Sequence, residues 1–217
     1  PIVPIQLTQI QNRQKETSKE SSQSATHTTR QSDIMSTYIY YDQGEVPEDV
    51  ESVIIDSSVT EIGKNAFEGC ISLASIVIPE SVTTIGEAAF NGCTSLSSIV
   101  LPNSRTTIDY GAFEGCTSLA TIVIPNSVTI IGVLALYECK SLSSTVIPTS
   151  VTTIGRGAIC VSSSLSTIEI PISITTIPLL VFLVSLSLAT TVLPNTLTPI
   201  TVSSSPLPLP TTHLIYH

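Results

Sequence analysis

The sequence predicts a repeat solenoid built mainly of β-structure, and its internal repetition carries this prediction. The segment SVTTIGEAAFNGC at 81–93 recurs as SVTEIGKNAFEGC at 58–70, SRTTIDYGAFEGC at 104–116 and SVTIIGVLALYEC at 127–139. A prolyl column and a cysteine column keep the same step of 23 residues: Pro79, Pro102, Pro125, Pro148, Pro171 and Pro194, and Cys70, Cys93, Cys116 and Cys139. A fixed period of this length is typical of stacked coils, in which each unit buries its apolar side against the next.

One unit predicts the path of every coil. Ile76 and Ile78 alternate with Val77, which is the pattern of a half-buried strand. Pro79 and Gly86 mark corners on either side of a second short extended piece. The Ala-Phe pair that follows suits a short helical or 3₁₀ turn, which returns the chain to the next strand.

Composition shifts divide the chain into four parts. Residues 1–36 are rich in Gln, Ser and Thr, so we expect a disordered polar tail. Residues 37–49 open with β-prone TYIYY and should cap the first coil. Residues 50–200 should form about six to seven coils of 23 residues, with degenerate last copies. Residues 201–217 are expected to be a Pro-rich tail.

The apolar run IPLLVFLVSLSLATTVL at 177–193 is long enough to raise the question of a membrane span. It contains Pro178 and keeps the repeat register at Phe182, Leu188 and Leu193. We therefore predict a worn last coil, and a membrane span is the less favoured interpretation.

Composition also restricts the function. Hydrophobic residues make up 42% of the chain and charged residues 12%, with a net charge of −9, which argues against a nucleic-acid partner. His27, His213 and His217 lie outside the repeats, so no nucleophile–base pair is predicted. We expect no catalytic residue, cofactor or metal. No signal peptide is visible, but the chain begins with Pro and not Met, so cytoplasm and cell surface both stay open.

The cysteine column should consist of buried thiols that pack as small hydrophobic side chains. Together with the aromatic column of Phe67, Phe90 and Phe113, it should form the structural core. Cys160 lies two positions before the column, in line with Glu68 and other polar residues. We therefore predict that Cys160 is the thiol most exposed to solvent.

The unit LxxIxIPxSVTxIGxxAFxxC resembles the BspA-like leucine-rich repeats over about residues 50–200. Leu73, Ile76 and Ile78 match the LxxLxL strand of leucine-rich repeats, and Pro79 and Ser81 match the BspA-like class. The resemblance implies a curved right-handed superhelix that binds other macromolecules, often as a surface or adhesion protein, and it does not imply an enzyme.

Two outward surfaces are candidates for binding a partner, which we expect to be a protein. The first is a hydroxyl row beside a valine row on the strands: Ser75, Val77, Ser98, Val100, Thr121, Val123, Ser144 and Val146. The second is a threonine ladder beside an outward row that includes Ser81: Thr60, Thr83, Thr106, Thr129, Thr152 and Thr175. The valine row is either a consequence of β-propensity or a binding strip. The threonine ladder is either structural or an ice-binding or adhesion surface.

Overall fold

The structure of the chain is a computed structural model that describes residues 37–41, 46–104, 107–178, 181, 185, 187, 190–193 and 213–216. These residues lie within one compact unit, Met35–His217. The predicted polar tail at 1–36 lies outside the described residues, as does most of the predicted Pro-rich tail.

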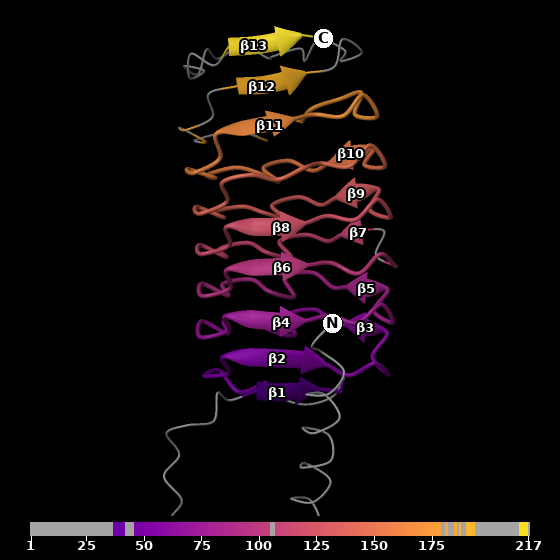
Figure 1. Cartoon of the computed structure of the whole chain (residues 1–217), viewed down its shortest axis with the longest axis vertical. Helices are drawn as coiled ribbons and strands as arrows, with labels where there is room; N and C mark the ends of the chain where they lie inside the picture. Colours follow the sequence, from indigo (N-terminus) through magenta and orange to yellow (C-terminus); the bar gives the residue numbers. More distant parts are fainter. Residues whose placement is uncertain are drawn as a thin grey trace, which may run out of the picture. The chain divides into compact units, whose positions relative to one another are not determined.

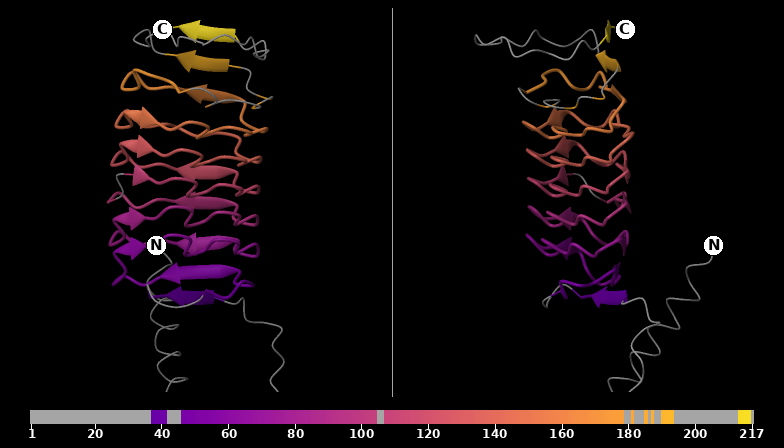
Figure 2. Two further views of the ribbon diagram at one scale, coloured as in Figure 1. Left: turned by 180° about the vertical axis from the view of Figure 1, so that it is seen from behind. Right: turned by 90° about the vertical axis from the view of Figure 1, so that its left-hand side faces the viewer.

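The described strands stack in two columns, which Figures 1 and 2 show from three sides. The long-strand column consists of β1 (Thr37–Tyr40), β2 (Ser52–Ile55), β4 (Ser75–Val77), β6 (Ser98–Val100), β8 (Thr121–Val123), β11 (Thr167–Glu169), β12 (Thr190–Leu193) and β13 (His213–Tyr216). The short-strand column consists of β3 (Glu61–Ile62), β5 (Thr84–Ile85), β7 (Thr107–Ile108), β9 (Ile130–Ile131) and β10 (Thr153–Ile154).

Every strand pair in the described residues is parallel, because each coil brings the chain back in the direction in which it started. Ser52 pairs with Ser75, and Ser98 pairs with Thr121, which is the 23-residue step of the sequence. The β-solenoid predicted from the repeats is confirmed. The register also holds further along the chain than the sequence indicates, since Thr190 pairs with His213, which belongs to the segment predicted as a Pro-rich tail.

The apolar run at 177–193 contributes a strand to this stack. β12 lies within it and pairs with β11. Among the residues that the structure describes, no helix is long and apolar enough to cross a membrane.

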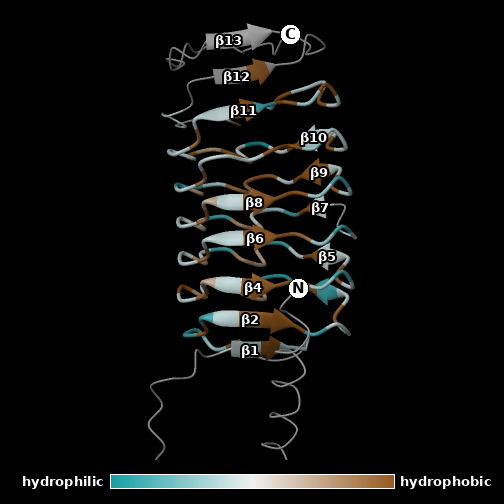
Figure 3. Cartoon of the chain, viewed as in Figure 1, coloured by the Kyte–Doolittle hydropathy of each residue, from teal (hydrophilic) through white to brown (hydrophobic). Residues whose placement is uncertain are grey.

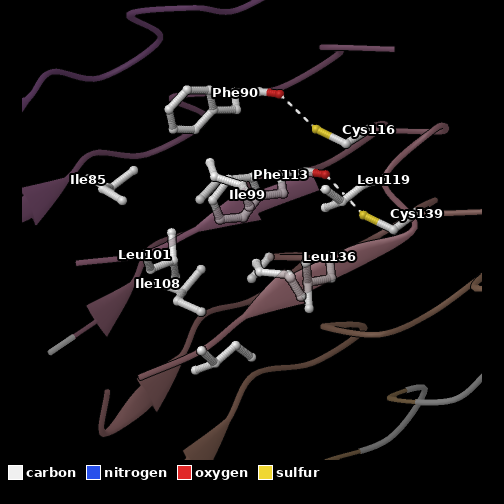
Figure 4. Packing of buried hydrophobic residues seen from close by; sticks show 14 of the residues in the cluster. Ile85, Phe90, Ile99, Leu101, Ile108, Phe113, Cys116, Leu119, Leu136 and Cys139 are labelled. Carbon is white, nitrogen blue, oxygen red and sulfur yellow. Dashed lines mark hydrogen bonds between the residues drawn. The ribbon is translucent and has the colours of Figure 1, made fainter. Parts of the chain in front are cut away.

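An aromatic stack runs through the core of the first coils. The rings of Phe67 and Phe90 are 5.2 Å apart with an interplanar angle of 4°, and those of Phe90 and Phe113 are 5.3 Å apart at 2°. Tyr40 of β1 covers the start of the stack, with its ring 5.0 Å from that of Phe67. Figure 4 shows Leu136 continuing the packing beyond Phe113. One side chain per coil thus joins neighbouring coils through apolar contact.

The turn that closes each coil is a series of linked turns, and the expected helical or 3₁₀ turn is absent from the described residues. Two positions in each coil have a positive φ. They are Asn65, Ala88, Gly111, Leu134 and Gly157 at the first position, and Gly69, Gly92, Gly115, Glu138 and Val161 at the second. A residue with positive φ cannot continue a right-handed helix. Within each turn the hydrogen bonds therefore join residues no more than three positions apart, such as Cys70 N to Phe67 O at 3.2 Å.

Glycine at one corner permits the backbones of successive coils to approach closely. A Cβ atom at Gly155 would lie 2.3 Å from Val133 N, and one at Gly86 would lie 2.7 Å from Lys64 N. The equivalent glycine of the first coil, Gly63, has nothing within 4 Å. The close contact therefore comes from the preceding coil and not from the corner itself, and one coil has Asp109 at the equivalent position.

This difference predicts unequal effects of one substitution at two repeat-equivalent positions. Gly155→Ala should lower the free energy of unfolding by about 1–3 kcal/mol, because the new methyl group overlaps backbone atoms of the preceding coil. Gly63→Ala should be neutral or slightly stabilising, because alanine restricts the unfolded chain and meets no atom in the folded one. Urea unfolding of the two variants measures the difference, and equal losses would contradict this explanation.

Candidate functional site

The first candidate surface, here called the strand face, is the outward side of the long-strand column between β4 and Val146. Ser98 and Val100 are exposed, whereas Ile99 between them is buried, and Ile122 is buried in the same way in β8. Figure 3 shows β4, β6 and β8 changing from white at their Ser or Thr end to brown at their Val end. The alternation places the predicted hydroxyl row and valine row side by side on one face.

The valines of the strand face are well exposed. The exposed fraction is 52% for Val77, 65% for Val100, 54% for Val123 and 81% for Val146. Val100 pairs directly with Val123, so the side chains of neighbouring coils stand next to one another. Both rows are uncharged from Ser75 to Val146, and the valine row ends at Glu169. The result is a narrow apolar strip bordered by hydroxyl groups.

The second candidate surface is the threonine ladder. Thr60, Thr83, Thr129, Thr152 and Thr175 are exposed, and Thr106 lies outside the described residues. Thr83 Oγ1 donates to Thr60 O at 3.1 Å, and Thr152 Oγ1 donates to Thr129 O at 3.3 Å. In these pairs the hydroxyl protons already bind the backbone of the preceding coil, as threonine side chains often do.

The serine row beside this ladder is less exposed than predicted, since only Ser58 is exposed and the other described serines of the row are half-buried. Ser81 is half-buried, and its hydroxyl donates to Val59 O at 2.8 Å. Ser150 and Ser173 donate to Val128 O and Val151 O at 2.7 Å and 2.6 Å. These hydroxyls tie one coil to the previous one across the corner. Ser127 of the same column is an exception, since its buried hydroxyl oxygen has no hydrogen-bond partner among the described residues.

The column of thiols is part of the core. Cys93, Cys116 and Cys139 are fully buried, and Cys70 nearly so. The Cys93 thiol donates to Phe67 O at 3.1 Å, Cys116 to Phe90 O at 3.1 Å, and Cys139 to Phe113 O at 3.3 Å; Figure 4 shows the last two contacts. Each thiol thus fills the space beside a phenylalanine and binds the carbonyl group of the preceding coil.

Burial keeps these thiols protonated. It raises the pKa of Cys93 and of Cys116 far above the ordinary value, and neighbouring thiols add to the effect. It raises the pKa of Cys139 to about 12. A thiol reacts as its thiolate, so the thiols of the cysteine column are unreactive while the coils are folded. None of the five cysteines forms a disulfide.

Cys160 has the largest exposed fraction of the five thiols, as predicted, but at 5% against 4% for Cys70 it is buried and does not reach solvent. Glu114 and Tyr137, at equivalent positions, are half-buried. Long side chains can extend from this partly covered position to solvent, whereas the short cysteine side chain stays beneath its neighbours. Burial raises the pKa of Cys160 as well.

Four titratable side chains lie close enough to influence one another electrostatically: Glu114, Tyr137, Glu138 and Cys160. No group of three or more His, Cys, Asp or Glu side chains among the described residues could hold a metal ion. The ion pairs Lys64–Glu87, 3.0 Å, and Lys140–Glu138, 3.4 Å, are exposed and contribute little. The hydroxyl and amide groups of Ser58 donate hydrogen bonds to Asp56 Oδ1 and hold the pKa of that carboxyl below its usual value. These bonds form the corner of the coil at the position where later coils have proline.

The buried thiols predict a fall in stability at alkaline pH. The folded pKa of Cys139 is raised to about 12 from 9.0, so its contribution is complete below pH 9 and is lost as the pH rises toward 12. Between pH 8 and pH 10 one such thiol should cost about 1.4 kcal/mol of unfolding free energy. Urea unfolding of the wild type should show a larger loss over this interval than Cys139→Ser, and equal pH dependence in both would contradict the burial argument.

Comparison with protein families finds one matching model. The model described as BspA type Leucine rich repeat region matches in six copies, over residues 45–165 and 93–204. This range covers more than half of the chain. A comparison with curated proteins finds no match.

Two solved structures share the fold at substantial identity. A leucine-rich repeat protein of T. pallidum is 32% identical, with a TM-score of 0.65, over 71% of this chain and 72% of that one. A leucine-rich repeat protein of Bacteroides ovatus is 36% identical, with a TM-score of 0.61, over 62% of this chain and 35% of that one. This chain thus matches only about a third of the Bacteroides protein. The coil geometry and these matches confirm the resemblance seen in the sequence: the chain belongs to the BspA-type leucine-rich-repeat family.

Proposed function

We propose that this chain is a non-enzymatic scaffold that binds a protein partner through the strand face. The observation that carries the proposal is the row of Val77, Val100, Val123 and Val146, which are 52–81% exposed in four successive coils. Leucine-rich repeats typically serve protein interaction, which agrees with this role.

β-Propensity alone explains why a strand contains valine, because branched side chains suit an extended backbone. It does not require that valine be chosen again on each coil where threonine would serve the strand equally well. Covering exposed apolar surface is favourable by roughly 25 cal/mol per Å². Four adjacent exposed valines therefore provide a free-energy gain to a partner that covers them, and contiguous apolar rows commonly mark such contacts.

The chemistry of the strip limits the partner. Both rows lack charge between Ser75 and Val146, so the contacting surface of the partner should be uncharged and apolar at its centre. A chain with a net charge of −9 disfavours nucleic acid. At about 4.8 Å per strand the four valines extend over about 14 Å, less than a standard interface of roughly 800 Å² per partner requires. We expect the strip to be the apolar centre of a larger contact whose rim lies on neighbouring coils.

The threonine ladder is the alternative binding surface. Its regularity would suit an ice-binding or adhesion role, but the Thr83 and Thr152 hydroxyl protons bind backbone carbonyls of the stack. Those internal bonds give the ladder a structural use that requires no partner. The valines of the strand face have no comparable internal use, and the proposal therefore rests on them.

Two matched variants test the choice between the surfaces. Val77→Asp/Val100→Asp/Val123→Asp places three charges on the strip, and Thr83→Asp/Thr129→Asp/Thr152→Asp places three on the ladder in nearby coils. Both variants should be checked for wild-type circular dichroism. In affinity capture from lysate with mass spectrometry, partners held by the wild type should be retained by the ladder variant and reduced at least 100-fold by the strip variant, because three desolvated charges oppose an apolar contact.

A partner held equally by the strip variant would remove the strand face as the binding surface. A partner lost from the ladder variant alone would transfer the function to the threonine ladder.

A further inference from the structure

One coil of the array, residues 142–164, departs from the pattern of its neighbours in its core. Thr145 occupies the column that contains Ile99, Ile122 and Ile168. Its side chain is buried, and its hydroxyl group has no hydrogen-bond partner among the described residues. A buried hydroxyl without a partner loses the free energy of hydration and gains nothing in return, whereas the isoleucines of the other coils fill the same space with apolar atoms.

The turn of the same coil has two further defects. Val161 has a φ of 63° at the position where three earlier coils have glycine, and a β-branched residue is strained in this region. Ser162 then takes the place of the column cysteine. It is fully buried and its hydroxyl group lacks a partner in the described part of the chain. By contrast, Ser185 at the next equivalent position donates to Ile159 O at 3.3 Å.

In the described residues the long-strand column is interrupted twice, between β4 and β6, which are not paired as strands, and at this coil. Between β8 and β11 the only pairing in the described residues is an isolated bridge from Thr121 to Ser144. Figure 1 shows the resulting gap between β8 and β11, while β9 and β10 continue the short-strand column beside it. The segment around Thr145 is thus held to the preceding coil by fewer backbone bonds than β8 is held to β6, and its coil also contains two of the three buried hydroxyl groups without a partner in the described residues.

We propose that coil 142–164 is a built-in breakpoint, at which the solenoid opens locally while the coils before it stay folded. In a stacked array each coil is held mainly by its two neighbours, so defects within one coil weaken the interfaces of that coil and leave distant ones intact. The break lies just beyond β8. Opening would therefore release the C-terminal coils and keep β4, β6 and β8, with most of the valine strip, in place.

Opening of this coil also exposes the Cys160 thiol, whose alkylation can report the opening. Cys160 lies in the breakpoint coil and is buried in the closed state, and Cys93 and Cys116 lie in coils that keep the isoleucine column and the glycine at the second positive φ. Alkylation requires that the buried thiol become accessible and ionise. Global unfolding exposes all of these thiols together, whereas opening at the breakpoint exposes Cys160 and spares Cys93 and Cys116.

Pulsed alkylation of the full native chain with iodoacetamide, followed by mass spectrometry of each cysteine peptide, tests the proposal. Rates are normalised to those of the same thiols in denaturant. Cys160 should be modified at least ten times faster than Cys93 and Cys116. One common rate for the three thiols would overturn the proposal, because it would mean that only global unfolding exposes them.

Repair of the coil separates local opening from simple surface access to Cys160. Thr145→Ile/Val161→Gly/Ser162→Ala restores the isoleucine column, restores glycine at the positive φ and removes the unpaired hydroxyl. It should slow modification of Cys160 at least tenfold. Thr153→Ile is the matched control, since it makes the same change on an exposed residue of the same coil and should leave the rate unchanged. A folded repaired variant that keeps the wild-type Cys160 rate would overturn the proposal.

Discussion

The structure depends on backbone hydrogen bonds that join each coil to the next in a fixed register. In the closing turn, Asn65 N donates to Glu87 O at 3.0 Å, Phe67 N to Ala89 O at 2.8 Å and Gly69 N to Asn91 O at 2.8 Å. The same spacing recurs from coil to coil. A backbone that must bond an identical backbone one step away has to follow an identical path, so the side chains sort into columns. The columns of stacked rings, thiols and corner glycines all follow from this constraint.

The period itself made much of the fold predictable. Repetition at 23 residues identified the solenoid, and alternation around Val77 identified the strands and their outward side. The closing turn was harder to predict, because Ala-Phe suits a helical turn and the positive φ is adopted even by Ala88 and Leu134. Such values reflect the stacking of coils, and local propensity does not show them.

The errors about individual side chains have a similar origin. Ser81 was expected to face outward because serine is polar, but the adjacent coil supplies Val59 O as an acceptor. Cys160 was expected to be exposed because its column is polar, but the exposure of that column depends on side-chain length. For Ser81 the deciding contact comes from a residue 22 positions away along the chain. The candidate binding surface was predictable as an outward row, whereas its partner depends on a second molecule.

Regular and irregular positions carry different information in such an array. The valine strip is repeated, so each further coil adds one exposed valine to the surface on which its proposed role depends. Thr145, Val161 and Ser162 are exceptions to the repeat, and they gather in one coil beside an interruption of the sheet. A scaffold with both features would present a rigid strand face on its first coils and a releasable segment after them.

Removal of one whole coil tests most directly whether a common register governs the structure. Deletion of residues 96–118 removes 23 residues and joins Ser95 to Leu119, which recreates the Ser-Leu junction of the repeat. We expect this shortened chain to keep the β-type circular dichroism and cooperative urea unfolding of the full protein. Deletion of residues 96–115 removes 20 and should abolish both, because every later column is displaced by three positions. Equal tolerance of the two deletions, or equal loss of folding, would contradict the account.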